Sequence, residues 1–127
     1  MKIRVYYEDT DAGGIVYHSN YLNFCERARS EYFFRKDRKP IIGDSHFVVR
    51  RIECDFVKSA KFADEIEVST KIVELKKSSL NIYQEITKDE EILFKATFLL
   101  VLVNPQTSKI TRINEEIQKE LITLFES

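Results

Sequence analysis

The stretch "SNYLNFCERARSEYFFR", residues 19–35, predicts one long helix that the rest of the chain must cover. Leu22 and Phe33 lie off its main apolar face, so we expect the helix to be covered on more than one side. Ser19 or Asn20 can cap the first turn by accepting a backbone hydrogen bond. The side chains of the main face recur at spacings of three and four, as on one side of a helix; they are Tyr21, Phe24, Cys25, Ala28 and Tyr32.

Strand-like stretches lie on both sides of this helix. Residues 2–7 alternate apolar and polar side chains before it, and residues 8–17 then form a loop. A polar connection with Pro40 and Gly43 follows the helix, and a C-terminal helix starts near Asn114. Short joins between strands favour antiparallel neighbours, because a parallel return needs a crossover of a dozen or so residues. Four strands are expected after the long helix, at residues 45–57, 64–76, 79–88 and 91–104.

This order predicts a single α+β domain that spans residues 1–127. The strands predict a five-stranded antiparallel sheet, and only one long helix is available to cover one of its faces. We therefore expect the sheet to be curved and the helix to lie across its concave side. A helix of about 17 residues extends roughly 25 Å, long enough to cross several strands. Another subunit would then cover the remaining face and edges, because exposed edges invite pairing.

Composition narrows the class of protein. The chain has 127 residues, 43% hydrophobic and 32% charged, as in an ordinary globular domain with one core. Its net charge is -1 and its basic residues are scattered, so no nucleic-acid partner is expected. No apolar run approaches the roughly 18 residues of a transmembrane segment. The alternating start "KIRVYY" does not resemble a signal peptide, so we expect a cytoplasmic location.

The two cysteines predict neither a metal site nor a disulfide framework. Cys25 and Cys54 lie far apart in the sequence, with no CxxC pair and no nearby histidine. Cys25 lies on the apolar face of the helix and is interpreted as a small core residue, not a nucleophile. A reducing compartment fits this pattern.

The loop before the helix, "EDTDAGGIVYH" at residues 8–18, combines three acids with two glycines. Glycines permit positive φ and close approach of another group. A helix N-terminus presents unpaired N–H groups and a partial positive charge. A carboxylate beside fixed N–H donors is the pairing required for attack on a carbonyl. The same residues also fit an ordinary turn in which acids bond their own backbone, and Asp9 in particular looks like a turn residue.

The longer stretch "YYEDTDAGGIVYHSNYLNFCERAR", residues 6–29, resembles a known family. It is similar to the first-strand loop and central helix of hotdog-fold thioesterases of the 4-hydroxybenzoyl-CoA thioesterase type, and most closely to the Tol-Pal-associated, YbgC-like acyl-CoA thioesterases. The shared motif is Tyr7, Asp11, Gly14, two apolar residues and the Asn20–Tyr21 pair at the helix start. The resemblance covers the whole chain in element order. It implies a hotdog fold and hydrolysis of acyl-CoA thioesters.

The resemblance assigns catalytic roles to three positions. Asp11 matches the catalytic carboxylate, which acts either as a nucleophile that forms a mixed anhydride or as a general base on water. The backbone N–H of His18 matches the donor that polarises the thioester carbonyl, and its imidazole is a further candidate for contacting substrate or orienting water. Tyr7, taken as a strand residue, could bond Asp11 or line the pocket.

Substrate and partners follow from the same resemblance. Gly14, Asn20 and Tyr21 match substrate-binding positions, and Lys76 and Lys77 in "LKKSSL" match a basic turn for the coenzyme A phosphates, although an ordinary solvated turn fits them equally. Neither a metal nor a cofactor is expected, since coenzyme A is part of the substrate. The acyl donor could also be acyl carrier protein. A homodimer or homotetramer with active sites at subunit interfaces is implied.

Several alternatives remain open. Another branch of these thioesterases uses an acid from the middle of the central helix, where Glu26 and Glu31 lie; Glu26 is followed by Arg27 and Arg29, so we expect an ion pair within the helix or across a subunit interface. "DTD" could indicate a magnesium-dependent phosphotransferase, but the chain lacks the helices for its parallel sheet. A hotdog hydratase would need a His–acid motif that is absent. A non-catalytic module that binds acyl-CoA or acyl carrier protein remains the main rival.

Overall fold

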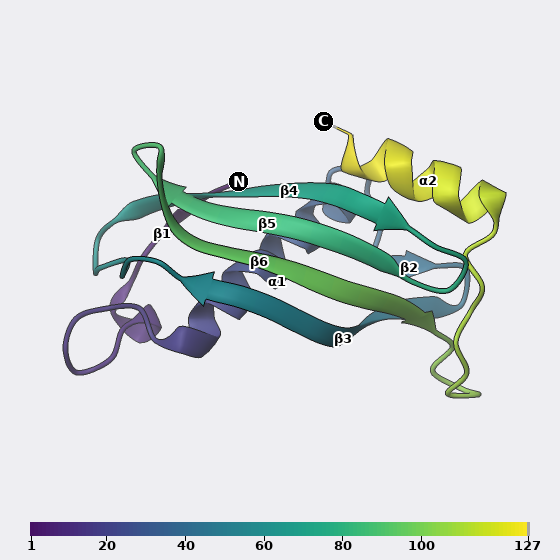
Figure 1. Ribbon diagram of the computed structural model, residues 1–127, viewed down its shortest axis with the longest axis horizontal. Coiled ribbons are helices and arrows are strands. Elements are labelled where there is room, and N and C mark those ends of the chain that lie inside the picture. The colour runs from purple at the N-terminus through teal and green to yellow at the C-terminus, as the bar shows by residue number, and fades with distance from the viewer. Residues whose placement is uncertain (127) are drawn as a thin grey trace.

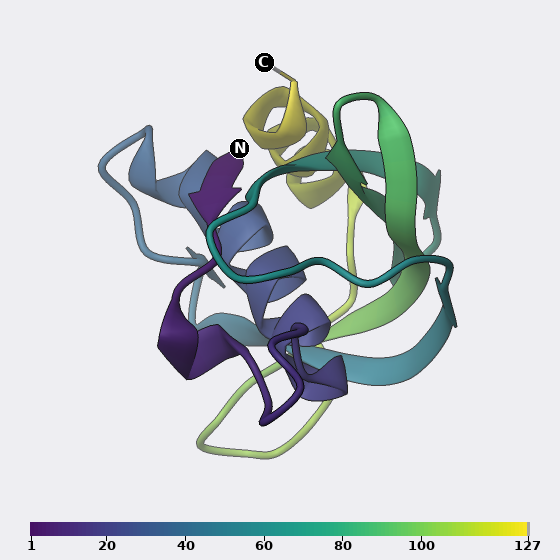
Figure 2. The same cartoon turned by 90° about the vertical axis from the view of Figure 1, so that its left-hand side faces the viewer.

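A curved antiparallel sheet wraps around one long helix in the computed structural model, which describes residues 1–126 (Figure 1). The long helix α1 spans His18–Phe34, and the short helix α2 spans Glu115–Phe125 near the C-terminus. Figure 2 looks along the sheet and shows α1 enclosed by its concave side. The sheet runs in the order β1-β4-β5-β6-β3-β2. Its strands are β1 (Lys2–Arg4), β2 (Ile41–Ile42), β3 (Ser45–Phe56), β4 (Glu65–Leu75), β5 (Leu80–Lys88) and β6 (Glu91–Val103).

The predicted α+β arrangement is confirmed, with two corrections to the strands. The sheet has six strands, not five, because Ile41–Ile42 pairs with the start of β3. The first strand ends at Arg4 instead of Tyr7, and Tyr7 begins a short 3-10 helix, η1 (Tyr7–Asp9). The reason for the early end is that Asp9 Oδ2 accepts the Tyr6 N–H at 2.9 Å, which turns the chain.

The face of α1 predicted to be apolar is buried, and so is part of a second face. Phe33 lies off the predicted face yet is only 1% exposed, whereas Tyr32 is half-buried. Coverage on more than one side is therefore confirmed. The reason is that the helix is enclosed by the sheet on one side and meets α2 near its C-terminal end, where Tyr32 and Phe33 contact Phe125.

One fully buried polar side chain ties α1 to the sheet. Gln84 of β5 donates from Nε2 to the Cys25 carbonyl and to Thr70 Oγ1, both at 2.9 Å. Its Oε1 accepts from Arg29 Nη1 at 2.8 Å. Because a buried amide without partners would be destabilising, these bonds fix where the middle of the helix sits on the sheet.

Most of β3 has a partner on one side only. It pairs along its length with β6, whereas β2 covers only Ser45 and His46 on the opposite edge. Within residues 1–126, the backbone edge from residue 48 to residue 56 has no strand beside it. Apolar side chains along this edge are partly exposed, among them Val48, Val49, Ile52 and Phe56. No helix among residues 1–126 is long and apolar enough to span a bilayer.

The burial of α1 predicts unequal costs for two phenylalanines on that helix. Phe24 is fully buried and Phe34 is 50% exposed. Phe24→Ala should therefore lower the free energy of unfolding by about 3 to 5 kcal/mol, from lost transfer energy and a residual cavity. Phe34→Ala is the control and should cost well under half as much. Urea unfolding measures both; equal losses would contradict this description of the core.

Candidate active site

The loop before α1 forms a small hairpin. Thr10 and Val16 form an isolated antiparallel bridge, and the Asp11 N–H donates to the Ile15 carbonyl at 2.9 Å. At the tip, the Gly14 N–H returns to the Asp11 carbonyl at 3.0 Å. Gly14 has φ +79°, which a residue with a side chain rarely adopts. This glycine therefore lets the hairpin close within a few residues of the helix.

The Asp11 carboxylate has one oxygen engaged in the hairpin. Oδ1 accepts the Gly13 N–H at 2.8 Å, and a Cβ at Gly13 would lie 3.2 Å from that oxygen. Oδ2 has no donor among residues 1–126, and the side chain is exposed in the single chain. The turn role and the catalytic role are thus compatible, because each uses a different oxygen.

Helix α1 begins without a side-chain cap. It starts at His18, and its N-cap Tyr17 makes no side-chain capping bond. The predicted cap from Ser19 or Asn20 is wrong, because both lie inside the helix, and Asn20 Nδ2 instead donates to the Asp9 carbonyl at 2.9 Å. No acceptor among residues 1–126 bonds the backbone N–H of His18. The helix start therefore presents the positive end of the helix dipole with a donor available.

Hydrogen bonds join the base of the hairpin to this helix start. The Asp9 carbonyl accepts the Tyr17 N–H at 3.1 Å as well as the Asn20 side chain. Asp9 ends the short 3-10 helix η1 and its Oδ2 accepts the Tyr6 N–H, which confirms that it is a turn residue. The loop that carries Asp11 is consequently held against the first turn of α1.

A second segment, residues 58–64, supports the hairpin from the other side. The Val16 N–H donates to the Ala60 carbonyl at 2.9 Å, and Ile15 forms an antiparallel bridge with Lys61. The sequence predicts only a break between two strands for this segment, so its supporting role was not predicted. The signal was present in "VKSAKFAD", where alternation stops for several residues before β4 begins.

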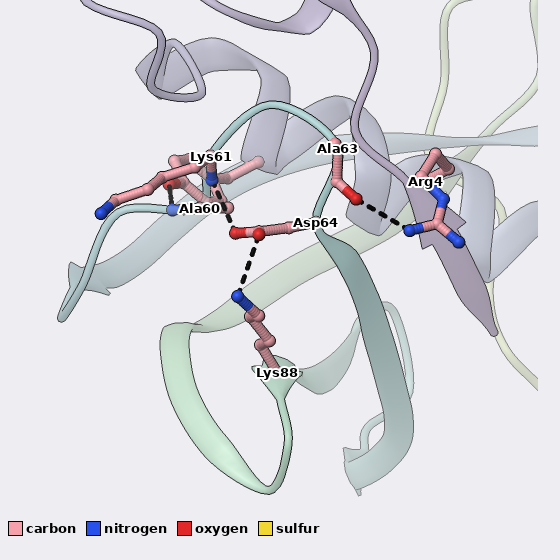
Figure 3. A network of polar contacts seen from close by, with 7 residues as sticks. Arg4, Ala60, Lys61, Ala63, Asp64 and Lys88 are labelled. Atoms are coloured by element: carbon pink, nitrogen blue, oxygen red, sulfur yellow. Dashed lines mark hydrogen bonds and ion pairs between the residues drawn. The ribbon is translucent and has the colours of Figure 1, made fainter.

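Asp64 organises the turn of this supporting segment (Figure 3). Its Oδ2 accepts the Lys61 N–H at 2.8 Å, and its Oδ1 pairs with Lys88 Nζ at 2.9 Å. Arg4 Nη1 donates to the neighbouring Ala63 carbonyl at 2.7 Å. Burial alone would raise the pKa of the Asp64 carboxyl, but the bonds from Lys88 and Lys61, together with their charges, bring it below its ordinary value.

Aromatic rings surround the hairpin and the helix start. Tyr7 is 75% exposed and stacks on Phe62, with ring centroids 3.9 Å apart. Within residues 1–126, no hydrogen bond joins its hydroxyl to Asp11. The His18 ring is exposed and lies 4.8 Å from the ring of Phe56, at the end of β3. Tyr7 and His18 therefore lie at the surface of the single chain, where a substrate or a second subunit could reach them.

Two of the predicted substrate-binding residues have structural contacts in the single chain. The Gly14 carbonyl accepts the Phe62 N–H at 3.2 Å. Tyr21 is 2% exposed, stacks on Phe94 at 5.1 Å and accepts the Ala60 N–H at 3.0 Å. Burial, the largest of its causes, raises the pKa of the Tyr21 hydroxyl. The Tyr21 ring is therefore part of the core.

Lys76 and Lys77 lie at the opposite end of the molecule from Asp11. They occupy the turn between β4 and β5, which Figure 1 shows at the right, whereas the hairpin lies at the left. Lys76 Nζ pairs with Glu74 at 3.2 Å, and both side chains are half exposed or more. A single chain does not bring these lysines to the same site as Asp11.

Two further predictions concerned ionisable groups on α1, and one of them is confirmed. Cys25 is fully buried, which confirms that it is a core residue, and this burial raises the pKa of its thiol to about 12. Glu26 is exposed and forms no ion pair within residues 1–126, so the predicted pair with Arg27 or Arg29 inside the helix is wrong. No group of three or more metal-binding side chains occurs in the described part of the chain.

A curved antiparallel sheet around one buried helix, with an acidic hairpin at the helix start, defines a hotdog-fold domain. The sequence model of the thioesterase superfamily matches residues 13–95. The chain belongs to this superfamily, and the predicted fold and family are confirmed.

Individual proteins with similar sequences or structures also carry thioesterase names. An acyl-CoA thioesterase YbgC of Helicobacter pylori (strain ATCC 700392 / 26695) is 49% identical over 86 residues, or 68% of this chain; the match spans 65% of that relative, less than two thirds of its length. An acyl-CoA thioesterase YbgC of Haemophilus influenzae is 35% identical over 120 residues, 91% of this chain and 88% of the relative. A solved probable thioesterase from Bartonella henselae is 30% identical and superposes with a TM-score of 0.82, over 90% of this chain and 97% of that one.

The Asp64 network predicts a pH-dependent contribution to stability. Because the pKa of Asp64 is lower in the folded state, its stabilisation is present above the unfolded pKa of about 4 and is lost as pH falls through the folded value. Asp64→Asn should lower the free energy of unfolding by about 1 kcal/mol at pH 7, since solvent screens the pair with Lys88.

The difference between wild type and Asp64→Asn should shrink as pH falls below about 4. Urea unfolding at pH 7, 5 and 3 measures it. Glu67→Gln, an exposed change on the neighbouring strand, is the control and should show no such trend. A difference that grows toward acid would exclude the assigned role of Asp64.

Proposed function

We propose that this protein hydrolyses acyl-CoA thioesters, with Asp11 as the catalytic carboxylate and the His18 N–H as the donor to the carbonyl. The observation that carries this proposal is the hydrogen bonding of the Asp11 hairpin against an uncapped helix start. One carboxylate oxygen and one backbone donor, both without a partner in the described part of the chain, are thereby held on adjoining segments. The names of the related proteins support the same substrate class.

Two chemical routes fit this arrangement. In the first, Asp11 accepts a proton from water while the water oxygen attacks the thioester carbon. In the second, Asp11 attacks directly and forms a mixed anhydride that water then cleaves. In both routes the carbonyl oxygen becomes negative next to the His18 N–H, and coenzyme A leaves as a thiol. Loss of one such donor typically costs about 2.7 to 4 kcal/mol in a transition state. No cofactor enters either route.

The free edge of β3 supports assembly of two protomers. Residues 48–56 expose backbone donors and acceptors together with apolar side chains, which is the surface that pairs with a second strand. We propose an antiparallel dimer through this edge, as the smallest assembly, with a tetramer possible by further contacts. A second protomer would provide the wall that Asp11 and His18 lack in the single chain. It could also bring Lys76 and Lys77 toward the coenzyme A phosphates.

The setting of the reaction is part of the proposal. We propose that it takes place in the cytoplasm, where acyl-CoA is found and where the two free thiols would remain reduced. Acyl carrier protein is an alternative donor of the same thioester. The main alternative is a module that binds acyl-CoA without hydrolysing it. A measurement of thioester hydrolysis distinguishes the two functions.

The first test is replacement of the carboxylate. Asp11→Asn keeps the shape of the side chain but removes the base and nucleophile, so thiol release from acyl-CoA should fall at least about a hundredfold. Glu8→Gln, an exposed neutralisation in the same loop, is the control and should keep most of the activity. A thiol-trapping assay across short, long and aromatic esters measures both. Wild-type binding without thiol release would favour the rival module.

The second test is replacement of Ile52 near the middle of the free edge. In an antiparallel pair the two copies of Ile52 lie close together, so Ile52→Asp would place like charges beside one another and separate the protomers. Light scattering after gel filtration should give a dimer for wild type and a monomer for Ile52→Asp. Val73→Asp, an exposed change on β4, is the control and should stay dimeric. A monomeric wild type would exclude the proposed assembly.

A further inference from the structure

A cavity of about 210 Å³ lies beside the second half of α1, away from the Asp11 hairpin. We call it the Arg29 cavity, after the one arginine in its wall. Glu26, Ser30 and His46 are its other polar residues. Most of its wall is apolar and comes from α1, β3, β6 and α2, with Phe33, Phe47, Val49, Leu100 and Phe125 as the main contributors.

The Arg29 guanidinium is only partly used by the protein. Its Nη1 donates to Gln84 at 2.8 Å, and its Cζ lies 4.4 Å from the centre of the Phe98 ring. No other hydrogen bond and no carboxylate within ion-pair distance engages it among residues 1–126. Because Arg29 lines the cavity, a ligand in it can reach guanidinium nitrogens that have no partner among residues 1–126.

A cation at the wall of an apolar cavity favours one class of ligand. An arginine is always charged and presents several N–H groups in one plane, which match the two oxygens of a carboxylate. Glu26 lies one helical turn earlier and also lines the cavity, but its side chain is exposed and forms no ion pair with Arg29 among residues 1–126. A ligand that matches this cavity would therefore be an apolar chain that ends in a carboxylate.

The proposed dimer places this cavity next to a catalytic loop. If the free edge of β3 pairs with its own copy in antiparallel orientation, with Ile52 opposite Ile52 and the bulge between Val49 and Arg51 kept, its two ends face one another and Phe56 of one protomer lies beside Phe47 of the other. Phe56 contacts His18 at the helix start. Phe47, together with Val49 on the same face of β3, lines the Arg29 cavity.

The relevant side chains also point to the same face of the sheet. Phe47, Val49 and Phe56 are paired across β3 and β6 with Leu102, Leu100 and Phe94, which are all buried on the concave side. Directly paired residues project to the same face. The cavity of one protomer and the His18 end of its partner are therefore on one side of the continuous sheet.

We propose that the Arg29 cavity binds the distal carboxylate of an acyl chain whose thioester lies at the Asp11 loop of the other protomer, which makes ω-carboxyacyl-CoA the preferred substrate class. This inference rests on the thioesterase function and the dimer proposed above. It adds a selectivity element that lies outside the loop motif.

The test compares esters of equal length with and without a terminal carboxylate. Adipyl-, suberyl- and sebacyl-CoA are set against hexanoyl-, octanoyl- and decanoyl-CoA. Wild type should show a kcat/KM ratio of at least about tenfold in favour of the carboxylate for at least one length, from a charge-assisted bond. Arg29→Met should bring that ratio to about one, and Arg29→Lys should keep part of it. Equal kcat/KM values for wild type at every length would overturn the proposal.

Folding must be separated from recognition, because Arg29 also bonds Gln84. The double variant Arg29→Met/Gln84→Leu removes both partners of this hydrogen bond. The buried Gln84 amide is then not left without its Arg29 partner. The double variant should fold, as judged by thermal unfolding, and should also lose the carboxylate preference. Arg27→Met is the matched control: it removes an exposed arginine two residues earlier, outside the cavity wall, and should keep the preference. Loss of preference in Arg27→Met as well would contradict a specific role for Arg29.

A mixed dimer tests which active site the cavity serves. One subunit carries Asp11→Asn and the other carries Arg29→Met, and the pair is purified by two different tags. If the cavity serves the partner, one site keeps both groups, so the wild-type ratio should persist at about half the rate. If it serves its own chain, the only active site lacks Arg29 and the ratio should be about one, which would overturn the proposal.

Binding without turnover separates this inference from the proposed function. Non-hydrolysable thioether analogues of suberyl- and octanoyl-CoA are titrated calorimetrically into wild type and Arg29→Met. Tighter binding of the suberyl analogue to wild type alone supports the cavity assignment even if no ester is hydrolysed. Equal dissociation constants would overturn it even if hydrolysis is rapid.

Discussion

The placement of α1 within the curved sheet is the constraint on which the rest of the structure depends. The buried side chains of the helix pack against those of the sheet to form the core, and two polar contacts fix the position of the helix along the sheet. Gln84 holds the Cys25 carbonyl in the middle of the helix, and Tyr21 holds the Ala60 N–H near its start. Because the helix cannot slide or rotate without breaking these buried bonds, its first turn is presented at a defined point of the sheet edge.

The hairpin depends on that placement. The hairpin has few residues and no core of its own. Its position is therefore fixed by three sets of contacts: its own cross-strand bonds, those to the start of α1 and those to the 58–64 segment. Asp11 shows how one side chain can close a turn and still have an oxygen available, since Oδ1 accepts the Gly13 N–H while Oδ2 has no donor among the described residues. Positioning by the scaffold, with little local freedom, is what carbonyl chemistry at such a loop requires.

The parts of the fold that could be predicted are those encoded by local periodicity. The spacing of apolar residues in 19–35 located the long helix to within a residue, and the alternation in later stretches located the long strands. Features that depend on tertiary contacts were missed. The early end of β1 at Arg4 follows from a bond between Tyr6 and Asp9, and the short strand β2 exists only because β3 folds back beside it.

The site shows the same division. Asp11 and Gly14 stood out by residue type, but the role of the 58–64 segment follows from hydrogen bonds between segments far apart in sequence. Asn20 was expected to cap its own helix and instead bonds the Asp9 carbonyl, because the hairpin folds back over it. Lys76 and Lys77 lie one strand length away from Asp11, a separation that linear spacing does not reveal.

The unequal edges of the sheet also limit how far association can continue. One outer strand, β1, has three residues, whereas the free part of β3 covers residues 48–56. On the β1 side, the outer edge of β4 from residue 69 to residue 75 also has no strand beside it within residues 1–126, but α2 packs near that stretch. Pairing of β3 with its own copy would therefore bury the open edge of each molecule and leave outside an edge that a helix partly shields, which limits the growth of sheets by edge-to-edge addition.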